Sequence, residues 1–143
     1  MKQQYVPAKI LMGIVSLTHI VTGLSGVLPP FPIWIAMAFY GATKLDLNPQ
    51  FEHILQMYGA YMVAVGILAA FATWNPLRNK AIIYGVSILL FIRVIQRLFF
   101  FEQANEVFGI SAWFYWVQTA IFLAFAVLLI LFRPKASELA KGS

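Results

Sequence analysis

The chain has 143 residues, of which 62% are hydrophobic and only 10% are charged. Soluble domains carry about 25% charged residues, so this composition indicates an integral membrane protein with room for about four helices of roughly 20 residues each. There is no cysteine, which excludes disulfides, thiolate zinc sites and iron–sulfur clusters within the chain, and the net charge of +5 comes from basic residues near segment ends rather than from a nucleic-acid-binding surface.

Four apolar runs follow one another along the chain and predict an all-α, four-helix transmembrane bundle. We expect a single domain over residues 1–143, with helices at about 8–28, 52–74, 80–101 and 110–132. The breaks between them are "LPPFP", "TWNPLRNK" and "EQANEVFG", and "RPK" stops the last run. Four crossings place both termini on the same side of the membrane.

The connection between the first two runs, residues 29–50, is long and unusually apolar. Its stretch "FPIWIAMAFYGATKL" has about 14 apolar residues or fewer, whereas a crossing needs roughly 17. We expect this segment to lie at the interface or to fold back over the bundle as a re-entrant segment.

The distribution of charges predicts an orientation. Basic residues on the side of the termini are Lys2, Lys9, Arg78, Lys80, Arg133, Lys135 and Lys141, and the opposite side holds Lys44, Asp46, Glu52, Glu102 and Glu106. The positive-inside rule therefore predicts cytoplasmic N- and C-termini.

Two arginines stand inside the third apolar run, in "FIRVIQRLFFFE". Counted from Phe101, Arg97 lies roughly 6 Å and Arg93 roughly 12 Å below the outer end of the helix. A charge at the centre of a span costs about 2.5–3.5 kcal/mol on insertion scales, so Arg93 is expected to face protein or water. Because the two residues are four apart, their guanidinium groups share one face of the helix.

Other polar side chains are expected at the same depth, so that all four spans contribute to one polar layer in the outer leaflet. The predicted cluster is His19, Glu52, Gln56, Arg93, Gln96, Arg97 and Gln118. One interpretation is a buried pocket for a quinone head group, a lipid phosphate or a pigment substituent. The other is structural, with both arginines pairing with Glu52 and with loop carbonyls to connect the helices.

His19 is a further candidate, because a lone imidazole in a span can ligate a haem or a pigment shared with a partner chain. The alternatives are a histidine satisfied by neighbouring threonines and a proton-transfer group. An axial pair with His53 is disfavoured, since the two rings differ by about 10 Å in height. The sequence has no nucleophile elbow, phosphate loop or zinc-protease pattern, and hence no catalytic constellation and no predicted metal site.

Small residues such as Gly23, Gly59 and Gly66 occur in the first two spans, where they allow close helix packing. We expect the second span to be the most enclosed of the four for this reason.

These features together resemble the DoxX-like group of small four-helix bacterial membrane proteins. The resemblance covers about residues 8–133 and depends on Glu52 at the start of the second span, on Tyr58-Gly59 followed by Gly66, and on the pair Arg93 and Arg97. It implies an accessory subunit in the inner membrane of a bacterium, because members of the group are bacterial membrane proteins linked to quinol-oxidising or thiosulfate-oxidising complexes.

Two functions are therefore predicted. The first is an accessory or structural subunit of a larger bacterial membrane complex, such as a respiratory or photosynthetic electron-transfer complex, in contact with lipids and other integral subunits. The second is a stand-alone quinone- or lipid-binding membrane protein that acts as an oxidoreductase partner. Quinone, lipid or pigment is the expected type of bound molecule at the polar layer, at an interface with partner chains in the first case, and no nucleic acid is expected.

Overall fold

A computed structural model describes residues 5–28, 33–46 and 48–134, and the described residues form six helices and no strand. The helices are α1 (Val6–Val27), α2 (Trp34–Tyr40), α3 (Pro49–Trp74), α4 (Lys80–Phe99), α5 (Phe101–Phe108) and α6 (Ala112–Leu131). Helices α1, α3, α4 and α6 are long and apolar enough to cross a membrane. The predicted all-helical chain with four candidate spans is therefore confirmed. Lys2, Lys135 and Lys141, used above to predict the orientation, lie outside the described residues.

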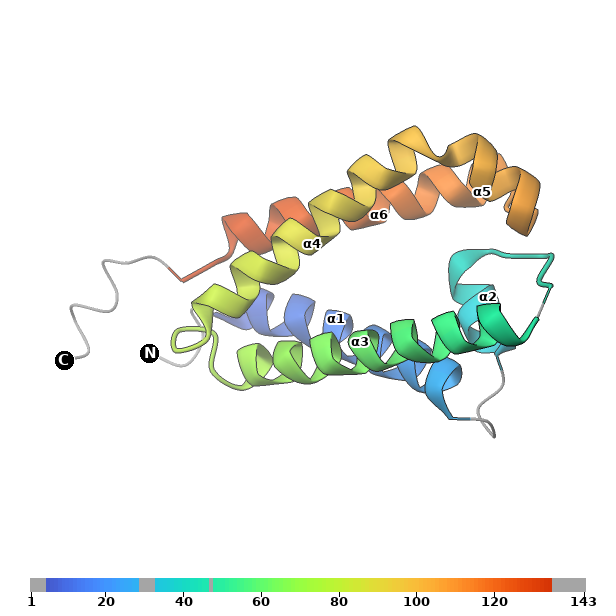
Figure 1. The fold of residues 1–143 in the computed structure, drawn as a ribbon. Coiled ribbons are helices and arrows are strands. Elements are labelled where there is room, and N and C mark those ends of the chain that lie inside the picture. The colour runs from blue at the N-terminus through green and yellow to red at the C-terminus, as the bar shows by residue number, and fades with distance from the viewer. Residues whose placement is uncertain (1–4, 29–32, 47, 135–143) are drawn as a thin grey trace.

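The spans are arranged as two pairs (Figure 1). Helix α1 lies along α3, and α4 lies along α6; these two contacts are the most extensive in the fold. The pairs approach each other near the short turn between α3 and α4, and they diverge toward the opposite end, where α2 and α5 are found. The start of α1 and the end of α6 both lie at the first of these ends.

Local sequence explains where several helices begin and end. The side chain of Asn48 accepts a hydrogen bond from the backbone nitrogen of Phe51 at 2.9 Å, and Pro49 occupies the first turn of α3, where no partner is needed for its nitrogen. Helices α2 and α5 both end at a glycine with positive φ, Gly41 at 72° and Gly109 at 62°. Such a conformation strains any residue with a Cβ atom.

Glycines pack α1 against α3. A Cβ atom at Gly59 would lie 2.6 Å from the backbone oxygen of Gly23, and one at Gly66 would lie 3.0 Å from the backbone oxygen of Ser16. The hydroxyl of Ser16 donates to the carbonyl of Gly66 at 2.8 Å, which is possible because the backbones are so close. The prediction that the second span is the most enclosed is wrong, however. Helix α1 is the most buried of the four spans and α3 is the least buried. The small residues of α3 that pack closely against α1 lie on one face only.

The apolar core joins the two pairs in the half of the bundle near the termini. Met12 of α1, Ile83 of α4 and Leu129 of α6 are among the most buried side chains. Val15, Leu90 and other apolar residues extend the same cluster. Apolar side chains fill the space between the pairs in this half, and the cavity described below lies toward α2 and α5.

Both connections on the side of α2 and α5 contain helices. The long first connection folds back against the bundle, since α2 contacts α1 and the side-chain amide of Gln118 in α6 donates to the carbonyl of Phe39. The break predicted at "EQANEVFG" is instead occupied by α5, which begins directly after the end of α4 and has no buried residue. The two connections are tied together, because the backbone nitrogens of Thr43 and Lys44 donate to the carbonyl of Phe108 at 2.9 and 3.1 Å.

Candidate functional site

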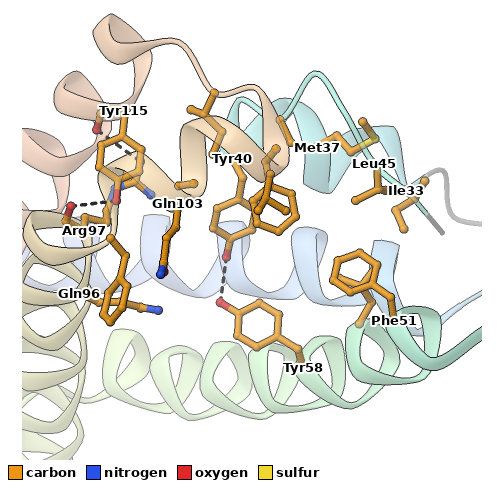
Figure 2. A pocket seen from close by; sticks show the side chains of 17 residues that line it. Ile33, Met37, Tyr40, Leu45, Phe51, Tyr58, Gln96, Arg97, Gln103 and Tyr115 are labelled. Carbon is orange, nitrogen blue, oxygen red and sulfur yellow. Dashed lines mark hydrogen bonds between the residues drawn. The ribbon is translucent and has the colours of Figure 1, made fainter. Parts of the chain in front are cut away.

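A cavity of about 700 Å³ lies between α2, the first turns of α3, the end of α4, helix α5 and the start of α6. Most of its wall is apolar, with Met37, Phe51, Leu55, Phe100, Phe108 and Ile110 among the lining residues. The polar lining side chains are Tyr40, Tyr58, Gln96, Arg97, Gln103 and Tyr115. Figure 2 shows Arg97 and Tyr115 toward one end of the cavity, Phe51 and Ile33 toward the other, and Tyr40 and Tyr58 between them. The cavity therefore has an apolar part and a polar, cationic part.

Arg97 is fixed at the edge of the cavity by contacts with α6. Its Nε donates to the hydroxyl of Thr119 at 2.9 Å and its Nη2 to the carbonyl of Tyr115 at 3.3 Å, and the guanidinium carbon lies 4.1 Å from the centroid of the Tyr115 ring. The Tyr115 hydroxyl in turn donates to the carbonyl of Arg97 at 2.9 Å. Because α4 ends at Phe99, Arg97 lies in the last turn, where a cation interacts favourably with the helix dipole. It is nearer the helix end than the count from Phe101 predicted.

Arg93, one turn deeper, is bound to Tyr58, one of two hydrogen-bonded tyrosines that line the cavity. Its Nη2 donates to the hydroxyl of Tyr58 at 2.9 Å, and the hydroxyls of Tyr58 and Tyr40 are 3.0 Å apart. With Tyr40 donating to the sulfur of Met62 at 3.5 Å, Tyr58 is the donor to Tyr40. Burial raises the pKa of Tyr40 above its ordinary value, although the charge of Arg93 acts in the opposite direction, so the Tyr40 phenol keeps its proton at neutral pH.

The hydrogen bonds of both arginines go to neutral acceptors. No ion pair forms within the described part of the chain at either guanidinium, and Glu52 is exposed on α3. The predicted pairing with Glu52 is therefore wrong. The physical reason is the rotation of α3, which turns Phe51, Leu55 and Tyr58 toward the cavity, so that Glu52 points about 100° away from Phe51.

The other predicted site residues divide into two groups. His19 and Gln118 are buried in the interior with the two half-buried arginines, and Gln96, although exposed, lines the cavity. Gln56 is exposed and, like Glu52, is not among the residues that line the cavity.

Four residues that hold the arginines or line the cavity beside them, Tyr40, Tyr58, Tyr115 and Thr119, are not among the predicted site residues. Tyr40 could not be placed from the sequence, because its position depends on how α2 folds back. Thr119 carried a signal, since it is four residues from Tyr115 on the inward face of α6.

His19 has one ring nitrogen satisfied within its own helix. Its Nδ1 lies 2.8 Å from the carbonyl oxygen of Val15. His53 is exposed near the start of α3, so the two histidines do not meet. Across the described ranges, three or more potential metal ligands from His, Cys, Asp and Glu gather nowhere.

Comparisons with known proteins add no family. No family model matches the chain, and neither a curated protein nor a solved structure is significantly similar to it. The resemblance to the DoxX-like group therefore stays a prediction.

Proposed function

We propose that this chain binds an anionic amphiphile, a phospholipid or a fatty acid, in the cavity beside Arg97. The observation that carries the proposal is the guanidinium of Arg97, which lines a largely apolar cavity and has only neutral hydrogen-bond acceptors. The polar end of the cavity would hold the head group, and the apolar wall would hold an acyl chain.

The balance of charge favours an anionic head group. Arg93 and Arg97 bring two positive charges into a mostly apolar region, and no carboxylate of the described residues pairs with either. A charge in such surroundings is costly unless it is compensated. Phosphate and carboxylate oxygens suit a guanidinium because they can accept two parallel hydrogen bonds.

The size and lining of the cavity agree with such a ligand. Its volume of about 700 Å³ falls within the range of about 300–1,000 Å³ that is typical of small-molecule sites. Apolar side chains from α2, α3 and α5, among them Met37, Leu55 and Phe108, surround the space away from Arg97. The hydroxyls of Tyr40 and Tyr58 lie between the two parts and could bind oxygen atoms near the head group.

A quinone is the competing ligand. Its carbonyl oxygens could accept hydrogen bonds from Arg97 and from the tyrosines, but they would leave both positive charges uncompensated. The anionic amphiphile is therefore preferred, and a retained quinone is an outcome that the following experiment detects.

The test is to identify what is bound to the protein after purification in a mild detergent. Native mass spectrometry and lipid extraction should find an anionic amphiphile on the wild type, and Arg97→Gln should lose it. Arg78→Gln is the matched control, because Arg78 is exposed in the turn between α3 and α4 and should retain the ligand. A wild type without bound amphiphile, or with a quinone in its place, would contradict the proposal.

A second variant tests the cavity without changing its charge. Ala104 of α5 lines the cavity, so Ala104→Trp should fill part of it and reduce the amount of bound amphiphile. Ala70→Trp, at an exposed position of α3, is the control and should leave binding unchanged. Equal binding by both variants would show that the amphiphile lies elsewhere.

We also propose that the cavity faces the extracytoplasmic side of a bacterial inner membrane. The described basic residues Lys9, Arg78, Lys80 and Arg133 belong to the end near the α3–α4 turn. Asp46, Glu52, Glu102 and Glu106 belong to the end with α2 and α5, where Lys44 is the one basic residue of the described connections. The positive-inside rule supports cytoplasmic termini, and reporter enzymes fused to each terminus would test this orientation.

An accessory role in a larger membrane complex is the second candidate. It is favoured by the exposed face of α3, where Ala60 and Ala64 have the small-xxx-small spacing and are both exposed. A partner span could pack closely there. Purification from native membranes should then recover further integral subunits, and replacing Ala64 by Leu should release them; a chain that always purifies alone would count against this role.

A further inference from the structure

Three buried side-chain atoms have no hydrogen-bond partner in the described part of the chain. They are Nε2 of His19 on α1, Nη1 of Arg93 on α4 and Oε1 of Gln118 on α6. His19 is 5% exposed and Gln118 is 7% exposed. Buried polar atoms are nearly always satisfied by protein or by ordered water, so three such atoms in one bundle need an explanation.

Several contacts bring the three residues to one region of the interior. The guanidinium carbon of Arg93 lies 5.9 Å from the centroid of the Phe122 ring, and Phe122 follows Gln118 by one turn on the same face of α6. On the α1 side, Thr22 lies three residues after His19 and donates to the sulfur of Met62 at 3.9 Å, and the same sulfur accepts from Tyr40, the hydrogen-bonded neighbour of Tyr58. None of the three residues lines the cavity, whereas Tyr58, whose hydroxyl accepts a hydrogen bond from Nη2 of Arg93, does.

The existing hydrogen bonds determine what each unpartnered atom can do. Nδ1 of His19 faces the carbonyl of Val15, which can only accept, so Nδ1 carries the proton and Nε2 of the uncharged ring is an acceptor. The amide nitrogen of Gln118 donates to the carbonyl of Phe39, so Oε1 is also an acceptor. Nη1 of Arg93 can only donate. The region therefore offers two acceptors and one donor.

We propose that one buried water molecule joins these three side chains. The water donates its two hydrogens to Nε2 of His19 and Oε1 of Gln118, and it accepts a hydrogen bond from Nη1 of Arg93. Three hydrogen bonds is the usual number for a buried water. An anion would be repelled by the two acceptors, and a metal cation would be repelled by the guanidinium, so a neutral hydroxyl group is the chemistry that fits.

This water would connect the two helix pairs. His19 belongs to the α1–α3 pair, and Arg93 and Gln118 belong to the α4–α6 pair. The water bridge and the direct bond from Arg93 to Tyr58 then hold the pairs together beneath the cavity by polar contacts. The inference does not depend on what the cavity binds, because none of these three residues lines the cavity.

Histidine-selective isotope labelling provides a direct test, because the chain has only two histidines. In solid-state NMR of the full chain in lipid bilayers, His19 should show a protonated Nδ1, and its ring should receive magnetisation from water. His53 is exposed and serves as the positive control. A His19 ring that receives none, while His53 does, would overturn the proposal.

Two variants test whether the proposed partners hold the water. Gln118→Met and Arg93→Met should each abolish the transfer from water to the His19 ring, and Gln118→Met keeps the experiment informative if the arginine variant does not fold. Ser87→Ala is the matched control, since Ser87 is buried and bonded to Ile83 within α4, and it should leave the transfer intact. Transfer that persists in both methionine variants would show that His19 is hydrated by another route.

Discussion

Helices α1 and α3 pack backbone against backbone, whereas α4 and α6 are connected near the cavity by a long cationic side chain. In the first pair, Gly23 and Gly59 are so close that neither has room for a Cβ atom. In the second pair, Arg97 reaches Thr119 and the carbonyl of Tyr115. The first contact excludes other molecules, and the second leaves a guanidinium at the edge of a cavity.

The difference shows how one small bundle can be both rigid and open. Lipid provides little hydrophobic drive for spans to associate, so close approach of small residues is an effective way to fix α1 against α3. A polar contact holds its helices at a greater separation, since the side chain itself occupies the space between them. The cavity lies on the side of the fold where the helices are joined by polar side chains rather than packed through glycines.

The largest expected effect comes from adding one methyl group to the glycine contact. In Gly59→Ala the new Cβ would lie 2.6 Å from the backbone oxygen of Gly23, so the helices must separate. Overpacking of this kind costs about 1–3 kcal/mol of the free energy of unfolding. Reversible unfolding in mixed micelles would measure the loss.

Gly85 provides the matched control for that substitution. It lies within α4, and a Cβ atom there would meet nothing within 4 Å. Gly85→Ala should therefore leave stability unchanged or raise it by up to about 1 kcal/mol, because alanine favours helix more than glycine does. Equal losses in the two variants would mean that the α1–α3 contact is not tight.

A smaller effect is expected at the polar contact of the second pair. Thr119→Val removes the acceptor of Arg97 Nε, and an unsatisfied donor costs about 1–3 kcal/mol in proteins. Intramembrane hydrogen bonds average about 0.6 kcal/mol, so we expect a loss of roughly 1 kcal/mol in the same assay. The loss should shrink when Arg97 has already been replaced by Met, since the two side chains act as a pair.

Thr73 is the control for this prediction. Its hydroxyl donates to the carbonyl of Ala69 within α3, and it accepts no hydrogen bond from an arginine. Thr73→Val should have little effect on stability. If the effects of Thr119→Val and Arg97→Met simply add, the hydrogen bond between α4 and α6 is not significant for folding.

The sequence was sufficient to place the arginines in the helical bundle but not to find their partners. The spacing of Arg93 and Arg97 and the cost of a charge in lipid predict that both turn toward protein, and the structure shows them bound to side chains of α3 and α6. The rotation of α3 could not be predicted, because that helix is apolar around most of its circumference. The sequence therefore suggests Glu52 as the partner of Arg93, whereas the observed partner is Tyr58.

The two short helices show a different limit. Helix α2 could be predicted only as a segment near the bundle, since its position depends on contacts such as that of Gln118 with Phe39. Helix α5 was missed because a segment of eight residues, half of them polar, resembles a loop. The spacing of Phe101, Ala104 and Phe108 was the available signal, because these residues share a face, and two of them line the cavity.

The smallest expected effect concerns Tyr40, which separates the polar part of the cavity from the apolar part, and it appears only at alkaline pH. Burial raises the pKa of this phenol in the folded chain, whereas an unfolded tyrosine loses its proton near pH 10. The contribution to stability is therefore complete below about pH 10 and declines above it, because the unfolded chain releases the proton first. The free energy of unfolding should fall more steeply as the pH rises above about 10 in the wild type than in Tyr40→Phe. Tyr61→Phe, at an exposed position of α3, is the control and should keep the wild-type dependence of stability on pH. If Tyr40→Phe also keeps the wild-type dependence, water reaches the Tyr40 hydroxyl, and the two tyrosines do not separate the interior from the cavity.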